Sequence, residues 1–255
     1  MEDKTLKGQL VKKIFIKGTI TAVSGLHIGG SNLGLSIGGV DNAIVRNPLD
    51  NFPYVPGSSL KGKMRSLLER LENKIGTKQM GDVKYGPYQN LSDPETNIPK
   101  VFGIASDDEK VDEPVSRLIV RDCHLTKDSR ERLEKMVGAD MPYSEVKTEV
   151  VIDRITSRAM PRQIERVPAG TIFDMELVLN IYYGDDESAM LKDVLQALSL
   201  VQDDYLGGSG TRGSGQVKIK VQPPEIKELK DYEAGTPARL MEGIDIPIEI
   251  RANGN

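Results

Sequence analysis

The segment with the strongest chemical character is a basic stretch at 57–65, which reads Gly-Ser-Ser-Leu-Lys-Gly-Lys-Met-Arg. Its apolar residues and those that follow recur at helical spacing, so we expect a helix with the first three residues as caps. Near a helix N-terminus, cations such as Lys61 and Arg65 cost roughly 0.3–1 kcal/mol each, and Gly62 about 1 kcal/mol. A phosphate bound to the exposed N–H groups would explain these costs. The alternative is a solvated basic face with an incidental glycine.

A second segment, at 207–215, contains five glycines and one cation, Arg212. It lacks the G-x-x-x-x-G-K-[ST] pattern of a P-loop ATPase. It also follows an expected helix and precedes an expected strand, which is the reverse of a dinucleotide-binding loop. Close backbone contact with an extended ligand would explain so many glycines. A flexible connection is the alternative.

Four arginines recur at a spacing of four residues within 153–170, namely Arg154, Arg158, Arg162 and Arg166. Pro161 and Pro168 exclude a continuous helix, so the stretch predicts a protruding loop or hairpin. A hairpin that reaches along a polyanion and a loop with merely solvated charge explain the arginines equally well.

His27 and Asp41 lie in a glycine-rich segment ahead of the basic helix. Packing is the commoner role for a histidine in such a place, and donation to a phosphate is the other. Turn formation is the usual role of an Asp beside glycines. A carboxylate near phosphates makes sense if it binds a divalent ion or takes a proton from a ribose hydroxyl. Cys123 and His124 face opposite ways in an expected strand, which predicts a core cysteine and a surface histidine.

The spacing of apolar residues along the chain predicts two successive β-α-β units, which is the order of a ferredoxin-like fold. The expected strands lie at 10–23, 117–125, 171–183 and 217–221, and the helices at 57–71 and 187–203. A further strand is expected near 145–152. Residues 74–115 have no sustained period and predict an insertion, and the tail after Pro223 shows no clear element before about 244–251.

Composition excludes several classes of protein. With 34 basic and 38 acidic residues in 255, the chain is not a uniformly basic nucleic-acid coat, although segments 57–70, 153–168 and 205–220 together carry +8. One cysteine and two histidines cannot build a Cys/His zinc site or an internal disulfide, so no zinc is expected. No signal peptide and no stretch of about 20 apolar residues is present, so we expect a cytoplasmic protein with no membrane partner.

Several of these segments occur in the order found in a known family. They are the glycine-rich stretches 25–30 and 37–41, the segment 53–65, the block 143–166 and the loop 204–215. Together they resemble the RAMP superfamily and, within it, the repeated backbone subunit of type III-A (Csm) CRISPR effector complexes. The likeness covers about residues 10–222.

The resemblance implies an α+β protein with a ferredoxin-like (RRM-like) core, inserted subdomains and a β-hairpin thumb. The core would span 1–222 with an inserted subdomain at 74–115 and a thumb at 153–170, and 223–255 would be a C-terminal extension. Copies would stack in a helical filament along a CRISPR guide RNA, with thumbs that wedge between guide and target RNA. Other Csm-type subunits, including the large polymerase-like subunit, would complete the complex.

The resemblance also implies roles for single residues. Asp41 matches the catalytic Asp of the family, which implies cleavage of target RNA that depends on a divalent cation, Mg²⁺, held by Asp41. Asn47 stands where the family often carries an acid, and weaker cleavage would follow if that acid assists metal binding. The positions that would bind RNA are His27, Ser58, Ser59, Lys61, Arg65, Arg154, Arg158, Arg162, Arg166, Gly208, Gly210, Arg212 and Gly213.

Two other functions stay open at this stage. A non-catalytic scaffold would bind and measure RNA without cutting it. A guide-processing endoribonuclease would cut a hairpin precursor without metal and would use His27 as its general acid or base.

Overall fold

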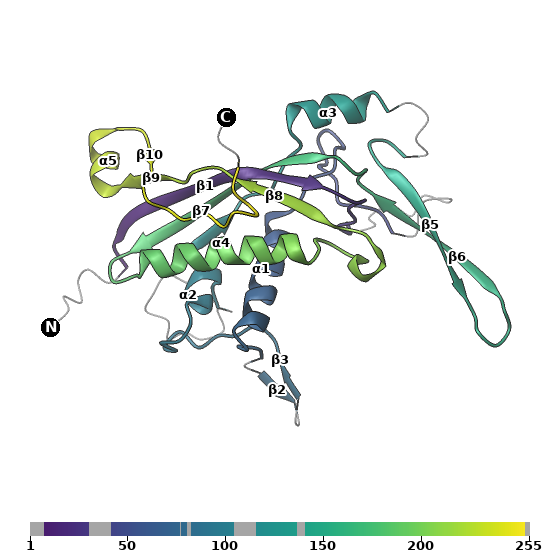
Figure 1. Cartoon of the computed structure of the whole chain (residues 1–255), viewed down its shortest axis with the longest axis horizontal. Helices are drawn as coiled ribbons and strands as arrows, with labels where there is room; N and C mark the ends of the chain where they lie inside the picture. The colour runs from purple at the N-terminus through teal and green to yellow at the C-terminus, as the bar shows by residue number, and fades with distance from the viewer. Residues whose placement is uncertain are drawn as a thin grey trace.

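The structure, a computed structural model, describes residues 8–30, 42–76, 78–80, 83–104, 116–136 and 141–252 (Figure 1). At its centre lies an antiparallel sheet with the core strand order β8-β1-β7-β4. These strands are β1 (Leu10–Ala22), β4 (Leu118–Val120), β7 (Ile172–Tyr182) and β8 (Val217–Val221). Helix α1 (Gly57–Leu71) follows β1, and α4 (Glu187–Asp203) follows β7. This connection order and strand order confirm the expected ferredoxin-like core.

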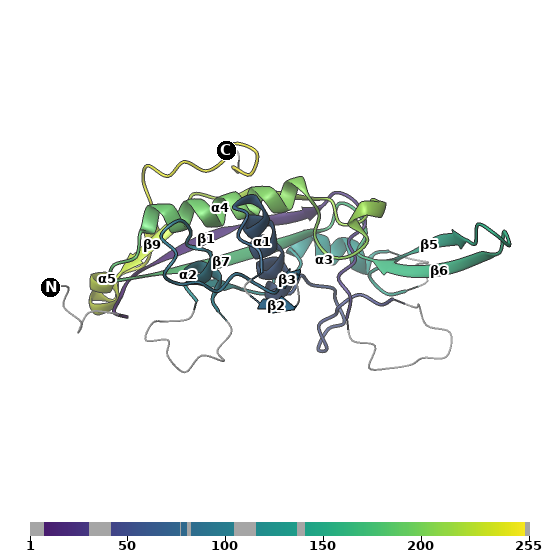
Figure 2. The same cartoon turned by 90° about the horizontal axis from the view of Figure 1, so that it is seen from below.

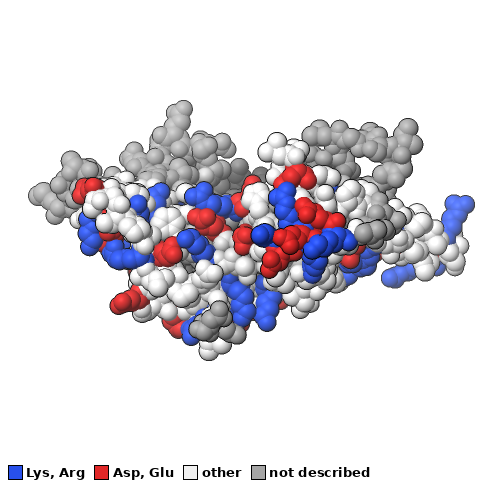
Figure 3. Space-filling view, turned by 90° about the horizontal axis from the view of Figure 1, so that it is seen from above, with Lys and Arg blue, Asp and Glu red and all other residues white. Residues whose placement is uncertain are grey.

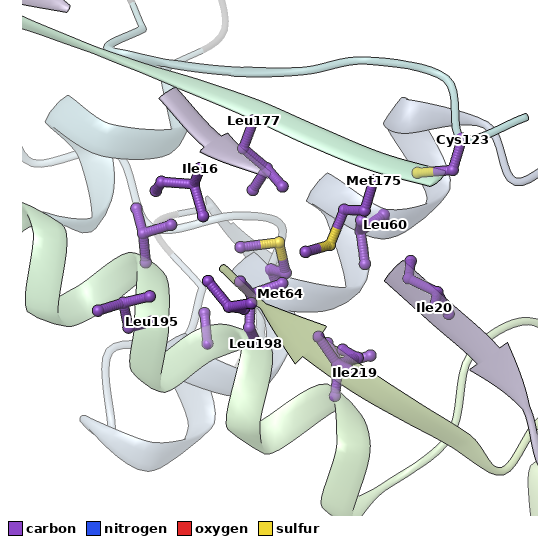
Figure 4. Packing of buried hydrophobic residues seen from close by; sticks show 14 of the residues in the cluster. Ile16, Ile20, Leu60, Met64, Cys123, Met175, Leu177, Leu195, Leu198 and Ile219 are labelled. Atoms are coloured by element: carbon purple, nitrogen blue, oxygen red, sulfur yellow. The ribbon is translucent and has the colours of Figure 1, made fainter. Parts of the chain in front are cut away.

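The alternation in β1 decides which face of the sheet the two long helices cover. Ile14, Ile16 and Ile20 are fully buried, whereas Lys17 on the opposite face is exposed. Figure 4 shows Met64 of α1 among these core side chains, with residues of α4 and β8 packed around it. Because each buried Leu, Ile or Met side chain contributes roughly 1.5–3 kcal/mol, this layer is the main source of stability.

The C-terminal extension contributes to both the sheet and the core. The sequence predicted no helix or strand in this extension before about 244–251. Strand β9 (Glu225–Glu228) pairs with β1 beside β8, and β10 (Arg239–Leu240) pairs with β9. Helix α5 (Leu229–Ala234) lies between them. Ile246 and Ile250 are buried in the same core as β1 and α4. The extension is therefore part of the main packing unit.

The insertion also joins the main core through one of its elements. It contains the short hairpin of β2 (Lys78–Met80) and β3 (Val83–Tyr85), followed by α2 (Ile98–Phe102). Ile98 and Val101 of α2 are fully buried in the cluster that holds α1 and α4. The segment is therefore not a wholly separate subdomain.

The strand expected at 117–125 is shorter than predicted, because only Leu118–Val120 forms a continuous ladder with β7. Helix α3 (Lys127–Glu134) follows and was not predicted. The Thr126 hydroxyl accepts a hydrogen bond from Ser129 N at 3.3 Å and caps this helix. The helix is almost entirely polar, so it lacks the apolar stripe on which the prediction of helices depended.

The protruding hairpin consists of β5 (Glu145–Ile152) and β6 (Ala159–Arg166), with its turn at 153–158 (Figures 1 and 2). The thumb bounds of 153–170 are therefore wrong. The strand expected at 145–152 forms one arm of the hairpin, and residues 167–170 lead into β7. A two-residue alternation identifies a strand but not the strand with which it pairs.

None of the described helices combines the length and apolar content that a membrane span requires.

Asp193 provides a test of the packing between α4 and the insertion. Its carboxylate is partly buried and accepts a hydrogen bond from Asn97 Nδ2 at 3.1 Å. Burial raises the pKa of Asp193 from 3.8 to about 6. The ionised carboxylate therefore reduces stability as pH rises from about 4 to about 6, and the full cost applies above that range.

We expect Asp193→Asn to keep the bond from Asn97 and to raise the melting temperature at pH 7.5. Because solvent screens the charge of a partly buried group, the free energy of unfolding should rise by on the order of 1 kcal/mol. The melting temperature should then rise by about 2–4 °C. The gain should disappear near pH 4. Thermal melts of both proteins across pH 4–8 would check this, and an equal gain at every pH would contradict it.

Candidate nucleic-acid interface

Residues from four separate parts of the chain meet in a groove at the base of the hairpin. The groove has a volume of about 440 Å³ and is lined by His27, Asn42, Glu149, Val150, Val151, Arg162, Ile164, Ser209 and Arg212. The segment of His27, the hairpin and the glycine-rich loop were each singled out from the sequence as basic or phosphate-binding. The fold places all three at one site.

His27 is held in a fixed orientation within this groove. Its Nδ1 lies 2.8 Å from the backbone oxygen of Glu165. A carbonyl can only accept, so Nδ1 carries the proton and Nε2 of a neutral ring is left as an acceptor. The backbone oxygen of His27 accepts from Gly208 N at 2.7 Å, which joins the glycine-rich loop to the same point.

The side chain of Glu165 joins the hairpin base to the chain that follows residue 41. The residue is fully buried. Its carboxylate accepts from Ile44 N at 2.9 Å and from the Ser144 hydroxyl at 2.6 Å. It also forms an ion pair with Arg46. A buried carboxylate is stable only when its oxygens are satisfied, so these donors fix both the segment 42–46 and Ser144, the residue before β5, against β6.

Asp41, the expected catalytic and metal-binding residue, lies outside the described residues. Asn42, the next residue in the sequence, lines the groove, and its backbone oxygen accepts from Glu165 N at 3.1 Å. Among the described residues, no group of three or more His, Cys, Asp or Glu side chains is placed to hold a metal ion.

In the groove, the Glu149 carboxylate is paired with two cations of the protein itself. Its carboxylate lies 2.9 Å from Lys147 Nζ and 3.0 Å from Arg212 Nε. Lys147, and to a lesser extent Arg212, holds the pKa of Glu149 below its usual value. Arg212 also donates to the Ser209 hydroxyl at 2.8 Å. This network ties the hairpin to the glycine-rich loop, while most of the Arg212 side chain stays exposed.

Packing within the protein explains the glycines of this loop. A Cβ at Gly210 would lie 2.1 Å from the Tyr205 ring, and one at Gly208 would lie 3.3 Å from the His27 ring. Gly213 has a φ of +83°, which side chains rarely tolerate. The loop needs its glycines in order to form at all, so they do not in themselves indicate a ligand. Their contact with RNA stays a prediction.

The start of α1 differs from the expected phosphate site. Residues 57–59 form the first turn of the helix rather than its cap, and the N-cap is Pro56. Gly57 N donates to the Asp122 carboxylate at 2.7 Å. A carboxylate of the protein therefore occupies the first N–H group that the sequence assigned to a phosphate. Ser58 is exposed and Ser59 is half-buried.

Lys61 and Arg65 are bound within the protein. Lys61 Nζ donates to the Ser116 hydroxyl and to Leu118 O, both at 2.8 Å. Burial, and then the nearby charge of Arg65, lower the pKa of Lys61.

Arg65 in turn joins α1 to the insertion. Its Nε donates to the Glu69 carboxylate at 2.7 Å and its Nη1 to Gly103 O at 2.8 Å. This arrangement does not support the expected RNA contacts of Lys61 and Arg65. It gives the two cations a structural role. Their contacts within the protein offset the electrostatic cost of placing cations in the first turns of a helix.

Three of the four hairpin arginines remain available to a polyanion. Arg154, Arg158 and Arg162 are exposed, and nothing in the described part of the chain pairs with their guanidinium groups. Figure 3 shows basic side chains at the far end of the hairpin. Arg166, at the base, lies 2.5 Å from the Glu145 carboxylate and is only 17% exposed.

Cys123 is buried, and burial raises the pKa of its thiol to about 12. His124 is exposed and stacks on Tyr54 with 5.8 Å between the ring centroids. The expectation of a core cysteine beside a surface histidine is confirmed.

Comparisons with known proteins agree with this fold. The RAMP superfamily model matches residues 19–218, so the chain belongs to the RAMP superfamily. A curated relative from Methanocaldococcus jannaschii, the CRISPR system endoribonuclease Csm3, is 40% identical over 236 residues, which cover 91% of this chain and 87% of that protein.

Two solved structures share the fold. A chain of the Csm3–Csm4 subcomplex of the type III-A CRISPR-Cas interference complex has a TM-score of 0.54 and 27% identity, and the match covers 91% of this chain and 90% of that one. The crystal structure of Methanopyrus kandleri Csm3 has a TM-score of 0.61 and 20% identity, with coverage of 88% and 80%.

The buried carboxylate at the hairpin base can be tested by Glu165→Gln. The amide keeps an acceptor for Ile44 N but loses the charge that pairs with Arg46, which should cost about 1.5–3 kcal/mol. Glu145→Gln removes the partly exposed partner of Arg166 and should cost about 1 kcal/mol or less. Denaturant unfolding of both variants measures the difference. Equal losses would show that Glu165 has no special role.

Proposed function

We propose that this protein is the guide-RNA-binding backbone subunit of a type III-A CRISPR interference complex. In this proposal its copies form a helical filament along the guide and cleave complementary target RNA at regular intervals, in the cytoplasm and with a divalent cation. One observation carries the proposal. The segment of His27, the segment after Asp41, an arginine of the hairpin and the glycine-rich loop meet in one groove, in a chain whose relatives are called Csm3 endoribonucleases.

The hairpin supplies most of the cationic surface for RNA in this proposal. Arg154, Arg158 and Arg162 lie on an element that projects from the body, so phosphates can approach them without desolvation of the core (Figure 2). Arg212 extends this surface into the groove, beside the ring of His27. Ser58 is exposed on α1, and its hydroxyl is available to the RNA backbone.

The proposed cleavage is an in-line attack by a ribose 2′-oxygen on the adjacent phosphorus. The bond from phosphorus to the 5′-oxygen breaks, which leaves a cyclic phosphate on one product and a 5′-hydroxyl on the other. The proton leaves the 2′-hydroxyl and a proton reaches the departing 5′-oxygen. We assign Asp41 to this step, and the hairpin to the placement of the nucleotide for in-line geometry.

The solved structures of similar fold also support proposals about the partners of this protein. The Csm3–Csm4 subcomplex supports contact with other effector subunits, and we extend this to the large polymerase-like subunit of such complexes. A chain with a similar fold belongs to the type III-B Cmr-β complex, and the structure of that complex has cognate target RNA bound.

The cleavage proposal is tested on the assembled complex with labelled complementary RNA, in Mg²⁺ and in chelator. We expect a ladder of evenly spaced products in Mg²⁺ and none in chelator. Asp41→Ala should abolish the ladder and leave guide binding unchanged. Asp50→Ala, at a nearby acid that pairs with Arg130, should leave cutting unchanged.

Other results would assign another function. Loss of guide binding in Asp41→Ala would overturn the catalytic role. A filament that binds matched target without cutting it would be a non-catalytic scaffold. Cutting of a hairpin precursor by the lone protein without metal would indicate a guide-processing endoribonuclease.

The RNA-binding role of the hairpin predicts a steep salt dependence. Each phosphate that is neutralised on a single strand adds about −0.7 to the slope of log K against log salt. Arg162→Ala should therefore reduce the magnitude of the slope by about 0.7. Lys230→Ala, at an exposed lysine on α5, should not change it. Titrations at several salt concentrations give both slopes, and a flat dependence in the unmodified protein would contradict RNA binding.

A further inference from the structure

The ring of His27 presents one free nitrogen at the groove that it lines. Its Nδ1 donates to the backbone oxygen of Glu165 at 2.8 Å, so Nε2 of the neutral ring carries a lone pair and no proton. No described residue donates a hydrogen bond to Nε2, and the side chain is only half-buried. Within the described part of the chain, Nε2 is therefore an acceptor that lacks a donor.

Two glycines leave room around this nitrogen. A Cβ at Gly29 would lie 3.7 Å from Nε2, and a Cβ at Gly208 would lie 3.3 Å from Cδ2, the ring carbon bonded to Nε2. Gly208 N also donates to the backbone oxygen of His27 at 2.7 Å, which holds the loop beside the ring. A ligand atom therefore approaches Nε2 past two residues that have no side chain.

The charges in the groove decide which group of a nucleic acid suits this nitrogen. A phosphate oxygen is an acceptor too, so the lone pair of Nε2 repels it. The guanidinium groups of Arg162 and Arg212 line the same groove and are much better partners for phosphates. Along an RNA strand a 2′-hydroxyl, which can donate, stands near each phosphate. An acceptor beside two cations therefore matches the alternation of hydroxyl and phosphate in RNA.

We propose that Nε2 of His27 accepts a hydrogen bond from a ribose 2′-hydroxyl of the bound guide strand, so that the groove selects RNA over DNA. The inference rests on the proposed function in one respect, namely that this groove holds RNA. It assigns the sugar to His27 and leaves the phosphates to the arginines. DNA has no hydroxyl at this position and would leave the lone pair of Nε2 unpaired.

The amino groups of the bases are the other strong donors of a nucleic acid. They differ from base to base, so a contact with them makes the affinity depend on sequence. Contacts with phosphate and sugar carry no sequence information, and the cations of the groove are of this kind. The sugar is therefore the donor that an acceptor beside these cations meets at every nucleotide. The experiment varies the sugar and the base separately for this reason.

The full-length protein is titrated at pH 8, at which imidazole is neutral, with a labelled single strand made as RNA and as 2′-fluoro RNA. The fluorine keeps the shape of the ribose but cannot donate. We expect the preference for RNA, as a ratio of Kd values, to fall about two- to tenfold in His27→Phe, the effect of one neutral hydrogen bond. His27→Gln keeps an acceptor on the side chain and should keep most of the preference. His124→Phe, at the other histidine of the chain, should leave it unchanged.

The outcomes separate this inference from the proposed function. If His27→Phe weakens the binding of both strands equally, His27 acts through packing. If strands of a second sequence show a preference that follows the base and not the sugar, Nε2 contacts an amino group. Either result overturns the inference and leaves RNA binding in place. If neither strand binds the unmodified protein, both the inference and the proposed function fail.

A second measurement needs no variant and so does not depend on the folding of His27→Phe. The nitrogen-15 spectrum of the histidines in the unmodified protein should show the proton of His27 on Nδ1. The Nε2 signal should then shift when RNA is added and shift much less with 2′-fluoro RNA. A proton on Nε2, or an equal shift with both strands, would contradict the proposed contact.

Discussion

The geometry of the whole groove depends on the buried carboxylate of Glu165. Its side chain has no exposure to water, so the cost of its charge must be met by donors within the protein. Those donors come from Ile44, Arg46 and Ser144, which belong to two segments far apart in the sequence. The carboxylate is satisfied only when both segments lie against β6. The backbone oxygen of the same residue then orients His27, so one residue sets both sides of the groove.

This constraint divides the hairpin into a fixed base and a free end. At the base, Arg166 is paired with Glu145, and Glu149 is bridged to the glycine-rich loop through Arg212. Arg162 lies opposite Glu149 in the ladder and lines the groove, and Arg158 and Arg154 lie towards the free end. Nothing in the described part of the chain pairs with the guanidinium groups of these three residues. A rigid base with unpaired cations at its end suits an element that must hold its direction and still exchange water for phosphate. The ordered turn at Asp153 keeps the end from fraying.

The sequence predicted the ferredoxin-like order and the bounds of α1 and α4, because their periodicity reports the face that the core buries. It misplaced the hairpin, because β5 alternates like a core strand although β6 is the only strand that pairs with it among the described residues. It also could not show that Lys61 reaches Leu118 or that Asp122 caps α1, since such contacts join residues 57 and 65 positions apart. Asp41, the residue of greatest interest, was reached only through resemblance, because an Asp beside glycines is most often a turn residue.

The same long-range contacts change the meaning of the charge distribution. Three segments carry +8 by their sequence, yet much of this charge is neutralised where it lies. Lys63 pairs with Asp204, Arg166 with Glu145 and Arg212 with Glu149, and all three acidic partners lie outside these segments. These acidic residues therefore act as partners that hold cations in the fold. On the hairpin, Arg154, Arg158 and Arg162 keep guanidinium groups that nothing in the described part of the chain pairs, so the element that projects furthest from the body presents cations to a polyanion.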